Sequence, residues 1–132
     1  MILLLFVFPQ LLSGQTHTIT TQEPDSLLYT IVDKEPEFPG GIQAMMNFIS
    51  MNTQYPPIQR CEPDGSVMVS FIVETDGKIS HVTIAKGFGN PSQYYDKEAL
   101  RVIGSMPRWS PGQKDGRVVR TRRFLPVKFH IR

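Results

Sequence analysis

The stretch GSVMVSFIVETDGKISHVTIAK, residues 65–86, contains two alternating apolar runs joined by a turn sequence. Apolar side chains of the first run fall on one face of an extended chain, because successive side chains of a strand point to opposite faces: Val67, Val69, Phe71 and Val73. An Asp-Gly pair at residues 76–77 separates the runs, and this dipeptide between alternating segments is typical of a β-hairpin. The stretch therefore predicts an antiparallel hairpin with strands over residues 66–74 and 79–86.

A helical pattern flanks this hairpin on each side. On the N-terminal side, apolar residues recur at the spacing of one helix face: Ile42, Met45, Met46 and Ile49. This helix follows the turn Phe38-Pro39-Gly40-Gly41 and is ended by Pro56-Pro57, and its methionines are predicted to pack in the core. On the C-terminal side, Asp96 is predicted to cap a helix that runs to about Ser105 and is stopped by Pro107.

Residues 117–132 are predicted to form a third strand, after a turn at Lys114-Asp115-Gly116. Pro126 cannot donate a ladder hydrogen bond, so this strand belongs at a sheet edge or carries a bulge. The helix after the hairpin returns the chain, so the third strand runs antiparallel beside the first. The prediction is an α+β fold, a two-layer sandwich in which two helices cover one face of a three-stranded antiparallel sheet of order second–first–third. Both the second and the third strand are then edge strands.

The N-terminal segment differs in composition from the rest of the chain. Residues 1–14 read as the apolar core and small-residue end of a secretory signal, with cleavage expected after Gly14. The alternatives are an uncleaved membrane anchor, for which the run is too short, and a short N-terminal apolar segment. Residues 15–30 are rich in Thr and Gln and are predicted to be a linker, and the folded domain is expected over residues 31–132.

Composition and charge restrict the functional classes. The chain has 132 residues, 40% hydrophobic and 20% charged, which is ordinary for one globular domain. Its net charge of +2 gives no indication of nucleic-acid binding. The charge is nevertheless polarised, at −5 for residues 1–64 and +7 for residues 65–132. The basic C-terminal part indicates an acidic partner or, as the alternative, a solvated face balanced by the acidic half.

No pattern in the sequence builds a catalytic or metal centre. His17, His81 and His130 lack the spacing of metal ligands, and Cys61 lacks an obvious His partner for nucleophilic catalysis. We therefore expect no enzyme activity, no metal and no cofactor. Trp109 is predicted to be a packing anchor whose indole N–H finds a backbone partner, with a partner-facing aromatic as the alternative.

Several sequence blocks, in this order, resemble one family. They are EFPGG at 37–41, QYP at 54–56, GSVMVSFIV at 65–73, DG at 76–77, DKEALR at 96–101, MPRWSPG at 106–112 and PVKF at 126–129. Together they resemble the C-terminal domain of TonB energy transducers in the form common in Bacteroidetes-type bacteria. The resemblance implies a TonB/TolA C-terminal-like domain in the periplasm that grips the acidic-hydrophobic TonB box of outer-membrane receptors. It also implies association with the inner membrane, where an ExbB–ExbD motor would act through a separate anchor.

The resemblance and the predicted topology point to the same strand as the binding surface. An edge strand can accept an extended peptide as an added strand, with main-chain hydrogen bonds giving affinity. The candidate partner-binding residues on this edge are Arg120, Arg122, Arg123, Phe124, Lys128 and His130. The arginines and Pro126 are equally suited to protect an edge from aggregation, and this alternative stays open, as does a weak homodimer through the edges. A fragment or accessory domain of a larger envelope sensor, with an interaction role only, is the alternative function.

Overall fold

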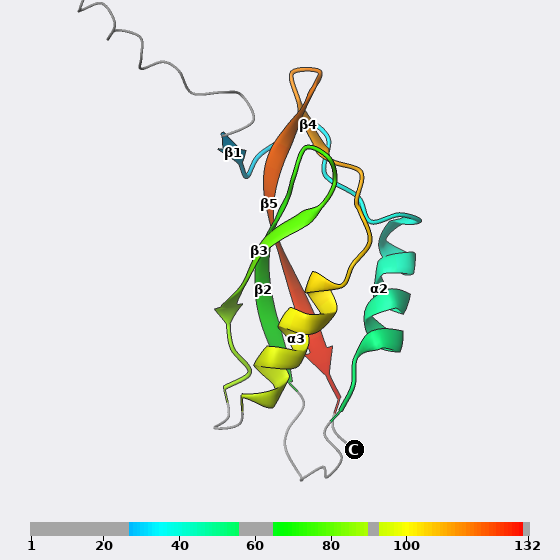
Figure 1. Cartoon of the computed structure of the whole chain (residues 1–132), viewed down its shortest axis with the longest axis vertical. Helices are drawn as coiled ribbons and strands as arrows, with labels where there is room; N and C mark the ends of the chain where they lie inside the picture. The colour runs from blue at the N-terminus through cyan, green and yellow to red at the C-terminus, as the bar shows by residue number, and fades with distance from the viewer. Residues whose placement is uncertain (1–26, 56–64, 90–92, 131–132) are drawn as a thin grey trace, which may run out of the picture.

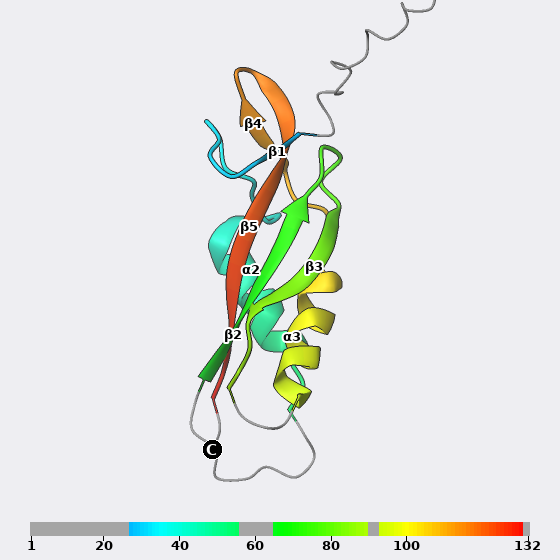
Figure 2. The ribbon, with the colours of Figure 1, turned by 90° about the vertical axis from the view of Figure 1, so that its left-hand side faces the viewer.

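The structure, a computed structural model, describes residues 27–55, 65–89 and 93–130. Its fold is α+β, with two helices and a curled mixed sheet (Figures 1 and 2). In chain order the elements are β1 (Leu28–Tyr29), α2 (Gly41–Asn52), β2 (Gly65–Val73), β3 (Ile79–Lys86), α3 (Tyr94–Gly104), β4 (Gly112–Lys114) and β5 (Arg117–Phe129). The predicted hairpin, both predicted helices and the long C-terminal strand are confirmed. The signal sequence expected over residues 1–14 lies outside the described residues.

The sheet is larger than the three antiparallel strands that the sequence predicted. Its order is β1-β5-β2-β3, so the three long strands do lie in the predicted order, second–first–third. However, β4 adds an antiparallel hairpin to β5, and β1 pairs in parallel with Arg120 and Thr121. Strands of two and three residues are too short to show a period of two, which is why the sequence pattern missed them. β1 also lies inside the segment that we predicted to be a linker.

The core lies on one face of β2 and takes residues from both helices. Val67, Val69, Phe71 and Val73 are fully buried, as the alternation predicted. Phe71 contacts the ring of Trp109 edge-on, with a centroid separation of 5.4 Å, and Trp109 is itself buried. Trp109 is thus a packing anchor, but the prediction that its indole N–H finds a backbone partner is wrong, since Nε1 has no hydrogen-bond partner in the described structure.

The β2–β3 turn packs against the backbone of Trp109. Gly77 has a positive φ of 88°, and its carbonyl accepts the Trp109 N–H at 2.9 Å. A Cβ at this position would lie 2.1 Å from the Trp109 carbonyl oxygen, closer than any side chain allows. Gly77 is therefore needed twice, for the left-handed backbone conformation and for the close approach.

The two helices lie differently against the sheet. Both helices lie on the same side of the sheet, where α3 packs on β2 and β3, whereas α2 passes behind β5 and lines a groove with that strand (Figure 2). The predicted core stripe of α2 is consequently only partly buried: Met45 is buried, but Ile42 is 73% exposed and Met46 is 56% exposed. α3 begins two residues before Asp96, whose carboxylate accepts the Phe88 N–H at 2.9 Å, so the prediction that Asp96 caps the helix is wrong.

Candidate functional site

A groove of about 750 Å³ lies between α2 and the C-terminal half of β5. We refer to it as the α2–β5 groove. Its lining comes from one face of α2, from the residues that follow α2, and from β5: Ile42, Met45, Met46, Ile49, Ser50, Thr53, Tyr55, Leu125, Pro126, Lys128 and His130. The wall formed by α2 is largely aliphatic, and polar groups occur mainly at the end near His130.

A second hollow of about 320 Å³ extends the groove along β5. The two share Ile42, Met45 and Leu125, so they form one continuous depression beside the strand. The second hollow reaches Trp109 and Arg123 at its far end. The depression therefore follows the edge of β5 from Arg123 to His130.

The edge of β5 that faces this depression is open. β2 pairs with residues 121–129 of β5 on one side, and on the other side no strand in the described parts of the chain pairs with residues 122–129. Pro126 shows which backbone groups of β5 point away from β2. It lies opposite Met68 in the ladder although it has no N–H, so position 126 is one whose N–H direction is away from β2. The same direction is indicated by the His130 N–H, which donates to Tyr55 Oη at 3.0 Å. Since backbone direction alternates along a strand, the outward donors are those of the even-numbered residues, including Phe124 and Lys128.

The six residues predicted from the sequence divide into two groups. Arg123, Phe124, Lys128 and His130 border the depression, so the structure brings these four together. Arg122 instead donates to Ser70 Oγ at 2.7 Å across the sheet. Arg120 lies where β5 is paired on both sides, and is bound by Glu74. The expectation of an edge position therefore does not hold for Arg120, because β1 covers the strand there.

Acidic partners occupy much of the positive charge on β5. Arg120 contacts Glu74 at 2.7 Å, and hydrogen bonding to Arg120 lowers the pKa of Glu74 below its usual value. Arg123 forms an ion pair with Glu35. Lys128, by contrast, forms no ion pair with any acid in the described residues, and it lines the groove. Arg117 and Arg122 on β5 likewise form no ion pair among the described residues, so Lys128 is distinguished from them by its position at the groove.

The residues that the sequence reasoning missed are those of the opposite wall. Ile42 and Met46 were assigned to the core, but they border the groove and stay exposed. One signal was present: with Phe48 added, the apolar stripe of this helix is wider than a single buried face needs. Methionine is also favoured at adaptable binding surfaces, because its side chain is unbranched and polarisable.

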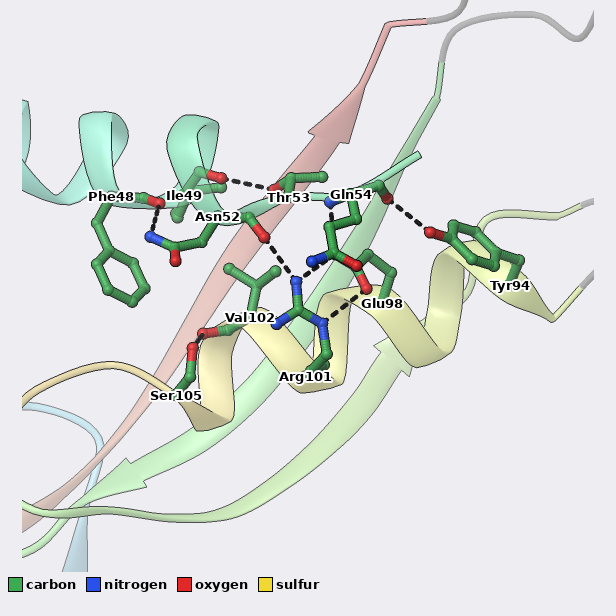
Figure 3. A network of polar contacts seen from close by, with 10 residues as sticks. All are labelled: Phe48, Ile49, Asn52, Thr53, Gln54, Tyr94, Glu98, Arg101, Val102 and Ser105. Carbon is green, nitrogen blue, oxygen red and sulfur yellow. Dashed lines mark hydrogen bonds and ion pairs between the residues drawn. The ribbon is translucent and has the colours of Figure 1, made fainter. Parts of the chain in front are cut away.

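A polar network holds the end of α2 against α3 (Figure 3). Glu98 Oε2 accepts the Gln54 N–H at 2.6 Å, and Arg101 Nη2 donates to the Asn52 carbonyl at 2.6 Å. Glu98 and Arg101 are also paired with each other, through contacts of 2.6 and 2.9 Å. Tyr94 Oη donates to the Gln54 carbonyl at 2.8 Å. These contacts fix the backbone immediately before Tyr55, which contributes to the groove.

Within the described ranges, no three His, Cys, Asp or Glu side chains are grouped so that they could hold a metal ion. No helix in the same ranges is long and apolar enough to cross a membrane. Ser80 and His81 of β3 lie near Glu74, which follows β2, but the Glu74 carboxylate is engaged by Arg120 and by the Ser80 hydroxyl. The described residues present an open strand edge beside an apolar groove.

A protein-family model matches more than half of the chain. The model described as Gram-negative bacterial TonB protein C-terminal matches residues 51–131, which include β2, β3, α3, β4 and β5. The matched region begins at the end of α2, so most of the aliphatic groove wall precedes it. No curated protein and no solved structure matched the chain.

Proposed function

Because the chain belongs to the family of Gram-negative bacterial TonB C-terminal domains, we propose that it binds an extended segment of an outer-membrane receptor by strand addition to β5. The family is a non-enzymatic, transport-associated domain of the cell envelope that interacts with outer-membrane receptors. The observation that carries the proposal is the open edge of β5 beside an apolar groove. The bound segment in this proposal is the TonB box.

Strand addition uses both the open edge of β5 and the apolar groove beside it. The outward backbone groups of Phe124 and Lys128 offer main-chain hydrogen bonds to an incoming strand, which supply affinity without regard to sequence. In an added strand, alternate side chains would point toward the helix side of the sheet, as Leu125 and Val127 do on β5. Those side chains would enter the α2–β5 groove, where Ile42 and Met46 present apolar surface. The site therefore suits a segment with an apolar side chain at every second position.

Charge gives a second criterion. Lys128 lines the groove and has no acidic partner among the described residues, so an acidic group in the segment would find a positive charge there. Such a contact at a solvent-exposed rim mainly speeds encounter and weakens as salt is added. The acidic-hydrophobic character of a TonB box meets both criteria.

The setting in the cell is part of the same proposal. We place the domain in the periplasm, in association with the inner membrane, where it would contribute to energy-coupled transport across the outer membrane. Force would come from an ExbB–ExbD motor acting through a separate anchor. Because one added strand makes a small interface, we expect the receptor segment to bind weakly, with a dissociation constant of about micromolar or weaker, as in transient complexes.

The proposal is tested by NMR titration of the full chain with a synthetic peptide, Ac-Glu-Val-Thr-Val-Thr-Val-NH2, referred to as the test peptide. Amide shifts should concentrate on residues 122–130 and on α2. A control peptide in which both Thr are replaced by Pro lacks two main-chain donors and should bind more weakly. The variant Phe124→Pro removes an outward donor of β5 and should weaken binding at every salt concentration, whereas Lys128→Glu should weaken it mainly at low salt. Shifts confined to α3 and β3 would refute strand addition to β5.

A further inference from the structure

We infer that Glu98 and Arg101 are positioning residues for the peptide site, although neither lines it. This inference rests on the proposed function, since it concerns how the groove of that site is kept in shape. The two residues fasten the last residue of α2 and the three residues that follow it, residues 52–55, to α3 (Figure 3). We call this segment the strap.

The contacts of the strap alternate between two sides. Asn52 and Gln54 give their backbone groups to α3, where Arg101, Glu98 and Tyr94 bind them over 2.6–2.8 Å. The residues between and after them, Thr53 and Tyr55, line the groove. Thr53 has extended backbone angles, with φ −77° and ψ 130°. Because contacts to α3 hold the backbone on both sides of Thr53 and immediately before Tyr55, they fix where these two side chains meet the groove.

Tyr55, the last residue of the strap, contacts the C-terminal end of β5. Its ring contacts Phe129 edge-on with a centroid separation of 5.9 Å, and its hydroxyl accepts the His130 N–H at 3.0 Å. This hydrogen bond occupies the edge donor at His130. Tyr55 therefore closes one end of the groove, and an added strand meets it after passing Lys128.

α2 needs such fastening because little of it is buried. Met45 is its one buried residue, and Ile42 and Met46 face the groove. At the N-terminal end, Phe38 is buried next to Phe48 and Trp109, with ring centroids 5.6 and 6.0 Å away. At the other end, the contact is made by Glu98, whose side chain is 6% exposed and whose carboxylate is bound on both oxygens. The wall is thus held at its ends with the groove between them and β5.

We call Glu98 and Arg101 the clamp. The experiment compares one variant of each clamp residue with a matched control variant, all in the full chain. Glu98→Gln removes the charge of the buried partner and keeps its shape, and Arg101→Gln removes the donor to Asn52 from a side chain that is 46% exposed and therefore tolerant of change. Glu74→Gln removes the same kind of carboxylate–arginine pair at Arg120, away from the groove. The two readouts are the dissociation constant of the test peptide and the exchange rate of the His130 amide hydrogen without peptide.

Both clamp variants should weaken peptide binding by roughly three- to thirty-fold, the range for residues that act on a site without touching its ligand. They should also speed exchange of the His130 amide, because Tyr55 is no longer held against it. Glu74→Gln should change neither readout by more than about two-fold. Unchanged His130 exchange in both clamp variants, or equal effects from Glu74→Gln, would overturn the inference. If the wild-type chain binds no test peptide, the proposed function fails, and His130 exchange alone then decides whether the clamp positions the strap.

Discussion

Replacing Met46 with Ser should weaken peptide binding while leaving the fold intact. Met46 lies on the groove wall and is 56% exposed in the free protein. Fully burying a methionine side chain contributes about 1.5–3 kcal/mol, so covering the exposed 56% on docking can contribute at most about 0.8–1.7 kcal/mol. Loss of that contribution raises the dissociation constant of the test peptide by up to roughly four- to seventeen-fold. Because the side chain is already largely in water, the free energy of unfolding should change by no more than about 0.5 kcal/mol.

The same helix supplies a matched control. Met51 is 83% exposed and does not line the groove, so Met51→Ser makes the same chemical change on α2 without altering the site. Isothermal titration calorimetry with the test peptide gives the dissociation constants, and urea unfolding gives the stabilities. If Met51→Ser weakens binding as much as Met46→Ser, or if neither does, the aliphatic wall plays no part in binding and the reasoning is refuted.

Three further predictions concern the stability of the core, the loss of stability at low pH and the cleavage of the N-terminal segment. Phe71→Ala should lower the free energy of unfolding by about 3–5 kcal/mol in urea, because the side chain is fully buried; an unchanged midpoint would contradict its place in the core. Hydrogen bonding to Arg101 lowers the pKa of Glu98 below 4.5, so its stabilisation is present above pH 4.5 and is lost as pH falls through the lowered pKa. Glu98→Gln should therefore reduce the loss of stability below pH 4.5, and an identical pH profile in the variant would count against this ion pair. Intact-mass measurement of periplasmic protein should show a chain that begins after Gly14, whereas full-length protein in the cytoplasm would contradict the export prediction.

The parts of this fold that were predictable are those with a repeating pattern long enough to be read. β2 and β3 alternate over eight or nine residues, and Asp76-Gly77 marks the turn between them. The strand order of the three long strands followed from chain direction alone. β1 and β4 escaped because two or three residues show no periodicity, and their pairing with β5 depends on where the chain passes in space.

The sequence predicted the β5 side of the candidate site but not the α2 side. The basic and proline-interrupted strand pointed to β5 as the edge, and Lys128 and His130 do line the groove. The helix pattern could not tell that Ile42 and Met46 face a groove, because an apolar stripe has the same spacing whether it is covered by a core or left open. No local pattern indicated that β1 would cover the strand at Arg120, or that Glu74, 46 residues away in sequence, would bind its side chain.

The sequence by itself determined the secondary structure of the long elements and the buried face of β2, because both depend on a repeating pattern of neighbouring side chains. It also determined the uneven distribution of charge, which depends only on where the charged residues lie along the chain. The tertiary structure alone decided which surface is available to a partner. It placed α2 beside the β5 edge and closed the groove end with Tyr55. It also tied the strap to Glu98, 44 residues further along the chain. Such contacts join residues remote in sequence, and no local pattern encodes the distance between them.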